Sequence, residues 1–208
     1  MDYEVTEDFL DDCGALLEKS ATEGKEDFGF IEGREDGQKI FLEGISEPPE
    51  DAEGKKYRRG FGGIVYFEEF GDIFRELIED GDRIIGHIHT HFTDQGMSYT
   101  DEDFFGKYDK LYKKRPVFSI VSPDSLVIRY GNSKRELDVS GTFSFSDDLK
   151  DKQEMYRNIG EAYSNTLDPT SLDDIYKRGL EAAKKDDMER VRAIGEEARS
   201  MAYMALWD

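Results

Sequence analysis

Three histidines and a nearby aspartate are the residues of this chain whose types and spacing could do chemistry. The segment GHIHTH, residues 86–91, holds every histidine of the 208-residue protein. On an extended strand, side chains two residues apart point to the same side, so His89 and His91 can bind one cation while Thr90 faces away. A hydrolytic zinc site needs three protein ligands and one open position. Asp101 is the candidate third ligand, because no histidine remains elsewhere to supply one.

Other side chains in this region have alternative interpretations. His87 shares the strand side of the pair, but on a straight strand it would lie about 13 Å from His91, which predicts a buried histidine that lines the pocket. Asp94 and Asp103 are alternative third ligands, although Asp94 would need a sharp turn back toward the histidines. Ser98 is also placed to cap the helix that follows it.

The thirteen residues HTHFTDQGMSYTD, from His89 to Asp101, resemble the signature of the JAMM (MPN+) zinc metallopeptidases. In that family two histidines flank a serine or threonine, and a later Ser-x-x-Asp completes the site. Gly86, three residues before His89, also fits the family pattern. The resemblance implies one zinc ion per chain, bound by His89, His91 and Asp101.

The same family carries a glutamate on an early strand, and Glu26 matches it here. Glu26 stands three residues ahead of one glycine and seven ahead of another in EDFGFIEG, residues 26–33. By resemblance, Glu26 is the general base that accepts a proton from water, and Ser98 donates a hydrogen bond to the oxyanion. Glu32 is the alternative to Glu26, and either glutamate could instead be a solvated carboxylate at a strand end.

Two features depart from the family pattern. The segment between His91 and Ser98 is one residue shorter than the commonest spacing, and Phe92 stands where proline is usual. A shorter segment makes a tighter turn into the helix and puts the position of Asp101 in question. Neither departure replaces a ligand, so the sequence still predicts an active metal site.

Composition and charge restrict the partners and the location. The formal net charge is −20, so the phosphate backbone of a nucleic acid would be repelled and basic partner surfaces are favoured, although the acidity also serves solubility. No apolar run approaches the ~20 residues that span a bilayer, and the acidic N-terminus does not resemble a secretory signal. With Cys13 as the only cysteine, no internal disulfide is expected. We therefore expect a cytoplasmic protein with neither nucleic acid nor membrane as a partner.

Hydrophobic periodicity predicts alternating helices and strands up to about residue 146. Helices are expected over residues 6–19, 70–78 and 100–113, the last capped by Ser98 or Thr100. Strands are expected over residues 27–31, 39–42, 83–89, 117–121, 126–130 and 135–139. The pattern is typical of an α/β fold with a mixed sheet flanked by helices. The resemblance implies the three-layer, cytidine-deaminase-like arrangement of JAMM/MPN domains.

Beyond that point the pattern is helical only. Three apolar stripes recur at helical spacing, in residues 156–163, 172–180 and 188–205. We therefore predict a JAMM/MPN-like catalytic domain over residues 1–146 and a helical extension over residues 147–208. The stripes are packing surfaces against the main domain or a second copy, or a docking surface for a partner.

The resemblance also implies a substrate class. JAMM enzymes mostly cleave isopeptide or peptide bonds after the diglycine tail of ubiquitin or a ubiquitin-like modifier. An extended tail needs a groove beside the zinc, and residues 57–67 could form one edge by strand pairing. Within them, RRGFGG, residues 58–63, is interpreted as a flexible loop without a role. The alternatives are a metal-free MPN-type scaffold subunit and a zinc hydrolase that acts on another peptide or a small amide.

Overall fold

The computed structural model describes residues 1–48, 57–60, 63–66, 68–80, 83–92, 97–110, 114–165 and 170–204. The chain divides into two compact units, residues 1–17 with 26–143 and residues 18–25 with 144–208. Helix α1 (Glu7–Glu23) begins in the first unit and ends in the second. The histidines, Glu26, Ser98 and Asp101 all belong to the first unit.

Seven strands form one mixed sheet among the described residues of the first unit. Their order is β1 (Asp2–Val5), β3 (Lys39–Ser46), β2 (Phe28–Asp36), β6 (Ile84–Thr90), β7 (Val117–Val121), β8 (Ser125–Tyr130) and β9 (Ser133–Asp138). β1 pairs with β3, and β6 with β7, in parallel, whereas the other neighbours are antiparallel. The predicted α/β class with a mixed sheet is confirmed.

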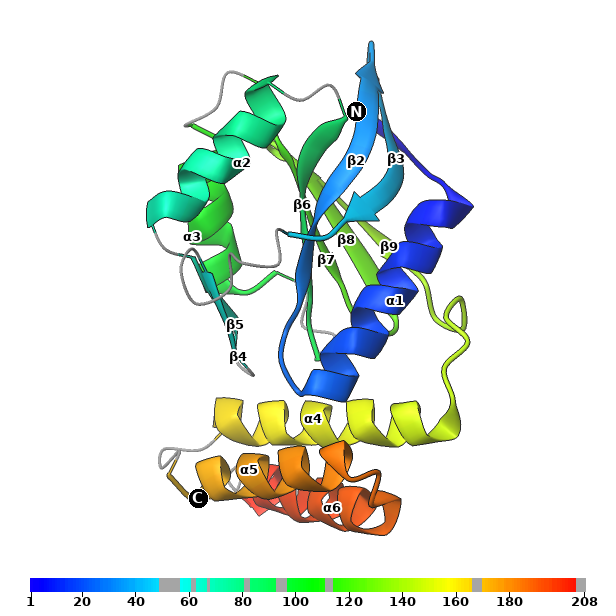
Figure 1. Ribbon diagram of the computed structural model, residues 1–208, viewed down its shortest axis with the longest axis vertical. Coiled ribbons are helices and arrows are strands. Elements are labelled where there is room, and N and C mark those ends of the chain that lie inside the picture. The colour runs from blue at the N-terminus through cyan, green and yellow to red at the C-terminus, as the bar shows by residue number, and fades with distance from the viewer. Residues whose placement is uncertain are drawn as a thin grey trace. The chain divides into compact units, whose positions relative to one another are not determined.

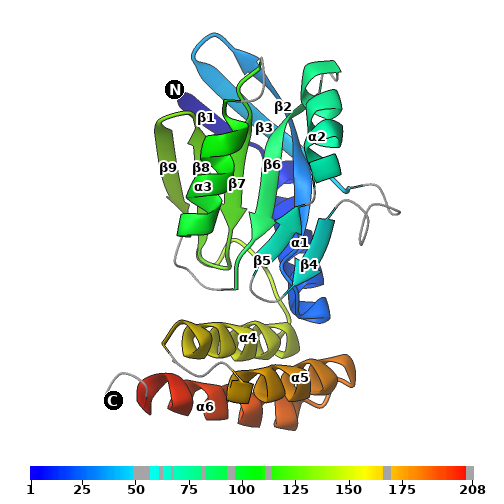
Figure 2. The ribbon, with the colours of Figure 1, turned by 90° about the vertical axis from the view of Figure 1, so that its left-hand side faces the viewer.

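Helices lie on both faces of this sheet. In Figures 1 and 2, α1 lies on one face, and α2 (Glu68–Asp80) and α3 (Tyr99–Tyr108) lie on the other. The stripes that predict the first two helices are buried, with Phe9 and Cys13 of α1 and Phe70 and Phe74 of α2 each at most 1% exposed. Helix α3 ends at Tyr108, earlier than the expected residue 113, and residues 111–113 lie outside the described part of the chain.

An aromatic core fills the space between the sheet and helices α2 and α3. Its members are the buried side chains of Phe28, Phe30, Phe70, Phe74, Ile78, Phe105, Phe118, Ile120 and Val127. Full burial of one such side chain stabilises a fold by about 1.5–3 kcal/mol, so this cluster holds both helices firmly on the sheet. The core therefore fixes the start of α3 relative to the end of β6.

Two strand features differ from the sequence-based expectation. β1 is an additional edge strand. Its four residues are too few for an alternating pattern to predict it. β4 (Tyr57–Gly60) and β5 (Gly63–Tyr66) form a separate two-stranded sheet in antiparallel register. The interpretation of residues 58–63 as a flexible loop is therefore wrong for both of these strands. Of the glycines that suggested a loop, Gly60 and Gly63 are instead a pair in this two-stranded sheet.

In the second unit, the described residues form the end of α1 and three further helices. The unit contains α4 (Asp147–Asn165), α5 (Thr170–Lys184) and α6 (Met188–Met204), which all pack on one another. The predicted stripes supply the core, with these side chains buried: Tyr156, Ile159, Leu172, Ile175, Val191, Ile194 and Ala198. The Tyr176 hydroxyl donates a hydrogen bond to the Gly24 carbonyl at 2.8 Å, so the end of α1 belongs to this unit. Across the described residues, no helix has the length and apolarity to cross a membrane.

Gly86 allows β6 to lie close to β7. A Cβ atom at this position would stand 2.0 Å from the Val117 carbonyl oxygen, which is a backbone atom that cannot simply rotate away. The close approach occurs three residues before His89, within the strand that carries the histidines. Glycine is therefore required here for packing and not for a turn.

Substitution of Gly86 tests this packing. We expect Gly86→Ala to lower the free energy of unfolding by about 1–3 kcal/mol, because the added methyl group must displace β7. Gly106→Ala in α3 is the control, since nothing lies within 4 Å of its Cβ position and alanine favours a helix. Urea unfolding followed by far-UV circular dichroism measures both variants. Equal midpoints for Gly86→Ala and the wild type would contradict the close approach.

Candidate metal centre

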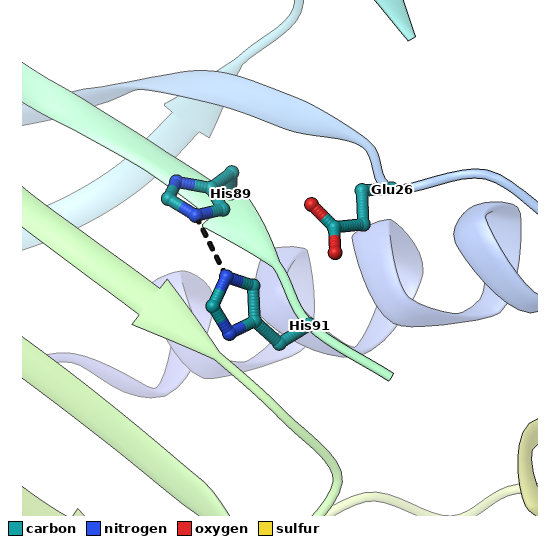
Figure 3. Close-up of side chains that lie close together, drawn as sticks. All are labelled: Glu26, His89 and His91. Atoms are coloured by element: carbon teal, nitrogen blue, oxygen red, sulfur yellow. Dashed lines mark hydrogen bonds between the residues drawn. The ribbon is translucent and has the colours of Figure 1, made fainter. Parts of the chain in front are cut away.

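The end of β6 brings His89 and His91 together. β6 is a central strand, and its register places His89 opposite Phe28 of β2 and Ile120 of β7. The two Nε2 atoms lie 3.1 Å apart, and both side chains are nearly buried (Figure 3). The same-side geometry expected for residues two apart is therefore present in the structure. Thr90, between them, faces away and accepts a hydrogen bond from the Asp27 amide at 2.9 Å.

The first turn of α3 supplies Asp101. Ser98 is the N-cap residue, and its Oγ accepts a hydrogen bond from the Asp101 amide at 3.2 Å. In return, the Ser98 amide donates to Asp101 Oδ2 at 2.7 Å, which completes a capping box. Asp101 Oδ1 lies 3.1 Å from His89 Nε2, and Oδ2 lies 3.5 Å from His91 Nε2. The carboxylate that caps the helix therefore also faces the histidine pair.

Glu26 approaches the same histidines from the segment just before β2. Glu26, His89 and His91 each offer one ligand atom, and these atoms all lie within 4.8 Å of one another. In Figure 3 the Glu26 carboxylate points toward the two imidazoles. These three residues form a group that could hold a metal ion. Its members come from segments more than 60 residues apart in the chain.

The distances fit a metal ion coordinated by nitrogen and oxygen. Ligand atoms arranged tetrahedrally at about 2.0–2.1 Å from an ion lie about 3.3 Å from one another. The observed separations are 3.1 Å between the two imidazole nitrogens, and 3.1 Å and 3.5 Å from these nitrogens to the oxygens of Asp101. Imidazole and carboxylate are ligands that zinc accepts. Asp101 and Glu26 are thus both placed beside the histidine pair, and either carboxylate could complete a three-ligand set.

The two carboxylates have opposite shifts in pKa. Burial, and then the negative charge of Asp101, raise the pKa of Glu26 well above its usual range. Burial also acts to raise the pKa of Asp101, but hydrogen bonds from His89 and Ser98 and the charge of the histidines hold it well below its usual range. A bound cation would lower both values, because positive charge favours ionised carboxylates.

Two of the three alternative site residues, Glu32 and Asp103, lie away from the histidine cluster. Glu32 forms an ion pair with Arg83 at 2.8 Å, toward the opposite end of the β2–β6 pairing from His89. Asp103 is exposed and binds Lys107 one helical turn away at 2.6 Å. Asp94 lies outside the described residues. Neither described alternative takes part in the histidine cluster.

His87 is fully buried in an aromatic environment. Its ring stacks on Phe28 with centroids 5.2 Å apart and contacts Phe70 and Phe74 edge-on. Burial and then the charge of His89 lower its pKa well below the usual value, and Asp101 opposes this only in part. These surroundings favour the neutral form of His87, which is buried in the core and not the partly buried pocket lining expected for it.

One ionic contact beside Glu26 is not predicted by the sequence. Arg59 of β4 lies 3.0 Å from Asp27, and their side chains are 9% and 1% exposed. The two atoms are not aligned as a hydrogen bond, so the contact is an ion pair. No local pattern links residues 27 and 59, because the pair depends on the hairpin packing against the start of β2. The only signal in the sequence was an arginine within residues 57–67, the range that could form a strand edge.

Comparisons with known proteins leave the function open. The sequence matches neither a family model nor a curated protein. Among solved structures, the chain is similar to the solution structure of protein DSY2949 from Desulfitobacterium hafniense. The two share 15% sequence identity, the match covers 66% of this chain and 90% of that chain, and the TM-score is 0.40. A similarity of this degree assigns neither a family nor a function.

The zinc affinity of matched variants identifies which carboxylate is the third ligand. Asp101→Asn is expected to weaken zinc binding at least about tenfold, because the amide loses the charge but can still accept the capping hydrogen bond. Asp103→Asn is the control, since it makes the same change two residues later on the exposed side of α3. Competition with a chromophoric chelator measures the affinity. If Glu26→Gln weakened binding and Asp101→Asn did not, Glu26 would be the third ligand instead.

Proposed function

We propose that this protein is a zinc-dependent metallopeptidase of the JAMM type that cleaves an isopeptide or peptide bond after the diglycine tail of a ubiquitin-like modifier. The observation that carries the proposal is the histidine pair of His89 and His91, with the Glu26 carboxylate within 4.8 Å of both and Asp101 at 3.1 Å and 3.5 Å from them. These are the residues that the JAMM signature and its upstream glutamate select. The mixed sheet with helices on both faces is compatible with the three-layer JAMM arrangement.

Zinc, when bound, supplies a Lewis acid that polarises the scissile carbonyl and makes water easier to ionise. His89, His91 and Asp101 hold the ion. The nearly buried position of their side chains strengthens every electrostatic interaction made there.

Glu26 is the proton carrier of the proposed mechanism. Its carboxylate faces the histidine pair, and it comes from the segment before β2 rather than from β6 or α3, which carry the proposed ligands. A carboxylate with a raised pKa takes up a proton more readily than an ordinary one, so it suits a group that accepts a proton from water and returns it to the leaving amine.

Ser98 stabilises the oxyanion. Its Oγ accepts the hydrogen bond from the Asp101 amide, and this leaves the hydroxyl proton available for donation. Such a donor typically contributes about 3 kcal/mol to the transition state. The cap and the oxyanion contact use different parts of one hydroxyl group, so the two roles are compatible.

The hairpin β4–β5 supports an extended substrate. It lies directly beside the base, because the Glu26 amide donates a hydrogen bond to the Gly60 carbonyl at 3.0 Å. A diglycine tail without side chains can enter a narrow groove and pair with a strand edge. The hairpin is therefore the proposed binding edge for the tail.

Cleavage of modifier fusions tests the function. The wild-type protein loaded with zinc is expected to release the partner from at least one member of a panel of ubiquitin-like fusions, and a chelator should abolish release. Glu26→Gln should lower kcat by about 10²–10⁴-fold with zinc retained, since the general base is lost. Glu32→Gln is the matched control, because it makes the same change further along the chain, in β2. This variant should stay active. Gel electrophoresis and mass spectrometry of the products measure release.

The outcomes also separate the alternatives. A scaffold subunit would purify without stoichiometric zinc and leave every fusion intact. A zinc hydrolase for another amide would bind zinc with the same ligands, leave the fusions intact and cleave unrelated peptides. Equal cleavage by the wild type and Glu26→Gln would remove Glu26 from the mechanism.

A further inference from the structure

The segment that carries Glu26 is held from two sides. On one side, the Asp27 amide donates to Thr90 Oγ1 at 2.9 Å, and the Thr90 amide donates to the Asp27 carbonyl at 2.9 Å. These bonds tie residue 27 to the end of β6, between the two histidines. On the other side, the Glu26 amide donates to Gly60 of β4. The main chain of Glu26 is thus held by the hairpin and not by the large sheet.

A buried ion pair adds to this attachment. Asp27 and Arg59 lie 3.0 Å apart with almost no exposure of either side chain. Asp27 Oδ1 also accepts a hydrogen bond from the Phe28 amide at 2.9 Å, which fixes its carboxylate. Breaking a buried pair from one side is costly because the remaining charge stays desolvated. If Arg59 were removed, Asp27 would have to reach water, and its neighbour Glu26 would move with it.

We infer that Arg59, paired with Asp27, is a positioning residue that couples docking of the β4–β5 hairpin to placement of Glu26 at the metal centre. The inference rests on the proposed function for the role of Glu26 as base. It adds that the base is correctly placed only while the hairpin is docked. The hairpin then serves two purposes, as the proposed edge for the substrate tail and as the support of the proton carrier.

Neutralising variants separate positioning from general stability. Arg59→Met leaves the Asp27 charge buried without its partner, whereas Asp27→Asn with Arg59→Met removes both charges and keeps an acceptor for the Phe28 amide. Arg83→Met is the matched control, because Arg83 also pairs with a carboxylate of β2, Glu32, but is exposed and at the opposite end. Zinc affinity should be unchanged in all three, since no ligand is altered.

The first measurement is independent of activity. Hydrogen exchange of the Glu26 amide, followed by NMR, should be accelerated at least about tenfold in Arg59→Met and should return toward wild type in the double variant. The Gly33 amide of β2 donates a hydrogen bond to the Arg83 carbonyl. Its exchange rate should not change in Arg59→Met. Unchanged exchange at Glu26, or equal acceleration at both amides, would overturn the inference.

The second measurement is the kinetics of the zinc-loaded protein on a cleaved fusion. Arg59→Met should lower kcat by about 10- to 100-fold, a range typical of residues that orient catalytic groups. On a logarithmic scale, the double variant should recover at least half of that loss in kcat. A kcat for Arg59→Met equal to that of Arg83→Met would overturn the inference and leave the proposed function intact. If the wild type cleaved no fusion but Glu26 exchange responded as expected, the proposed activity would fail and the coupling would stand.

Discussion

Two carboxylates beside one pair of imidazoles are the arrangement on which the rest of this structure depends. Asp101 contacts both histidines, and Glu26 lies close enough for the Asp101 charge to raise its pKa. Burying like charges together costs free energy unless a positive charge balances them. A divalent cation bound beside the histidine pair would supply that balance. The structure therefore presents a group that could hold a metal ion.

The fold holds this cluster at the junction of three elements. The register of β2 against β6 sets Phe28 opposite His89, so the segment before β2 passes the ends of both histidine side chains. Gly86 allows β6 and β7 to approach, and the aromatic core holds α3 on the same face. A shift of β6 by one residue would turn His89 and His91 to the other side of the sheet. Strand register and core packing thus contribute to the precision of the site.

The sequence predicts the parts of the site that are local. The spacing of His89 and His91, and the Ser98–Asp101 capping box, each lie within a few residues and follow from strand and helix periodicity. The mixed sheet follows from alternating patterns of strands and helices. In contrast, the Asp27–Arg59 pair, edge strand β1 and the packing of residues 18–25 with the second unit depend on contacts between distant segments. A four-residue strand and a glycine-rich hairpin carry too few alternating residues to be recognised locally.

The capping box explains why two nearby acids take different roles. Asp101 stands at the third position of α3, where the helix dipole and the Ser98 amide favour its ionised form. At Glu26, burial and then the negative charge of Asp101 disfavour the ionised form. The acid that stays ionised suits a permanent ligand, and the acid whose charge is disfavoured suits proton transfer. The surroundings of the two acids therefore match the roles that the proposed function gives them, with Asp101 as ligand and Glu26 as proton carrier.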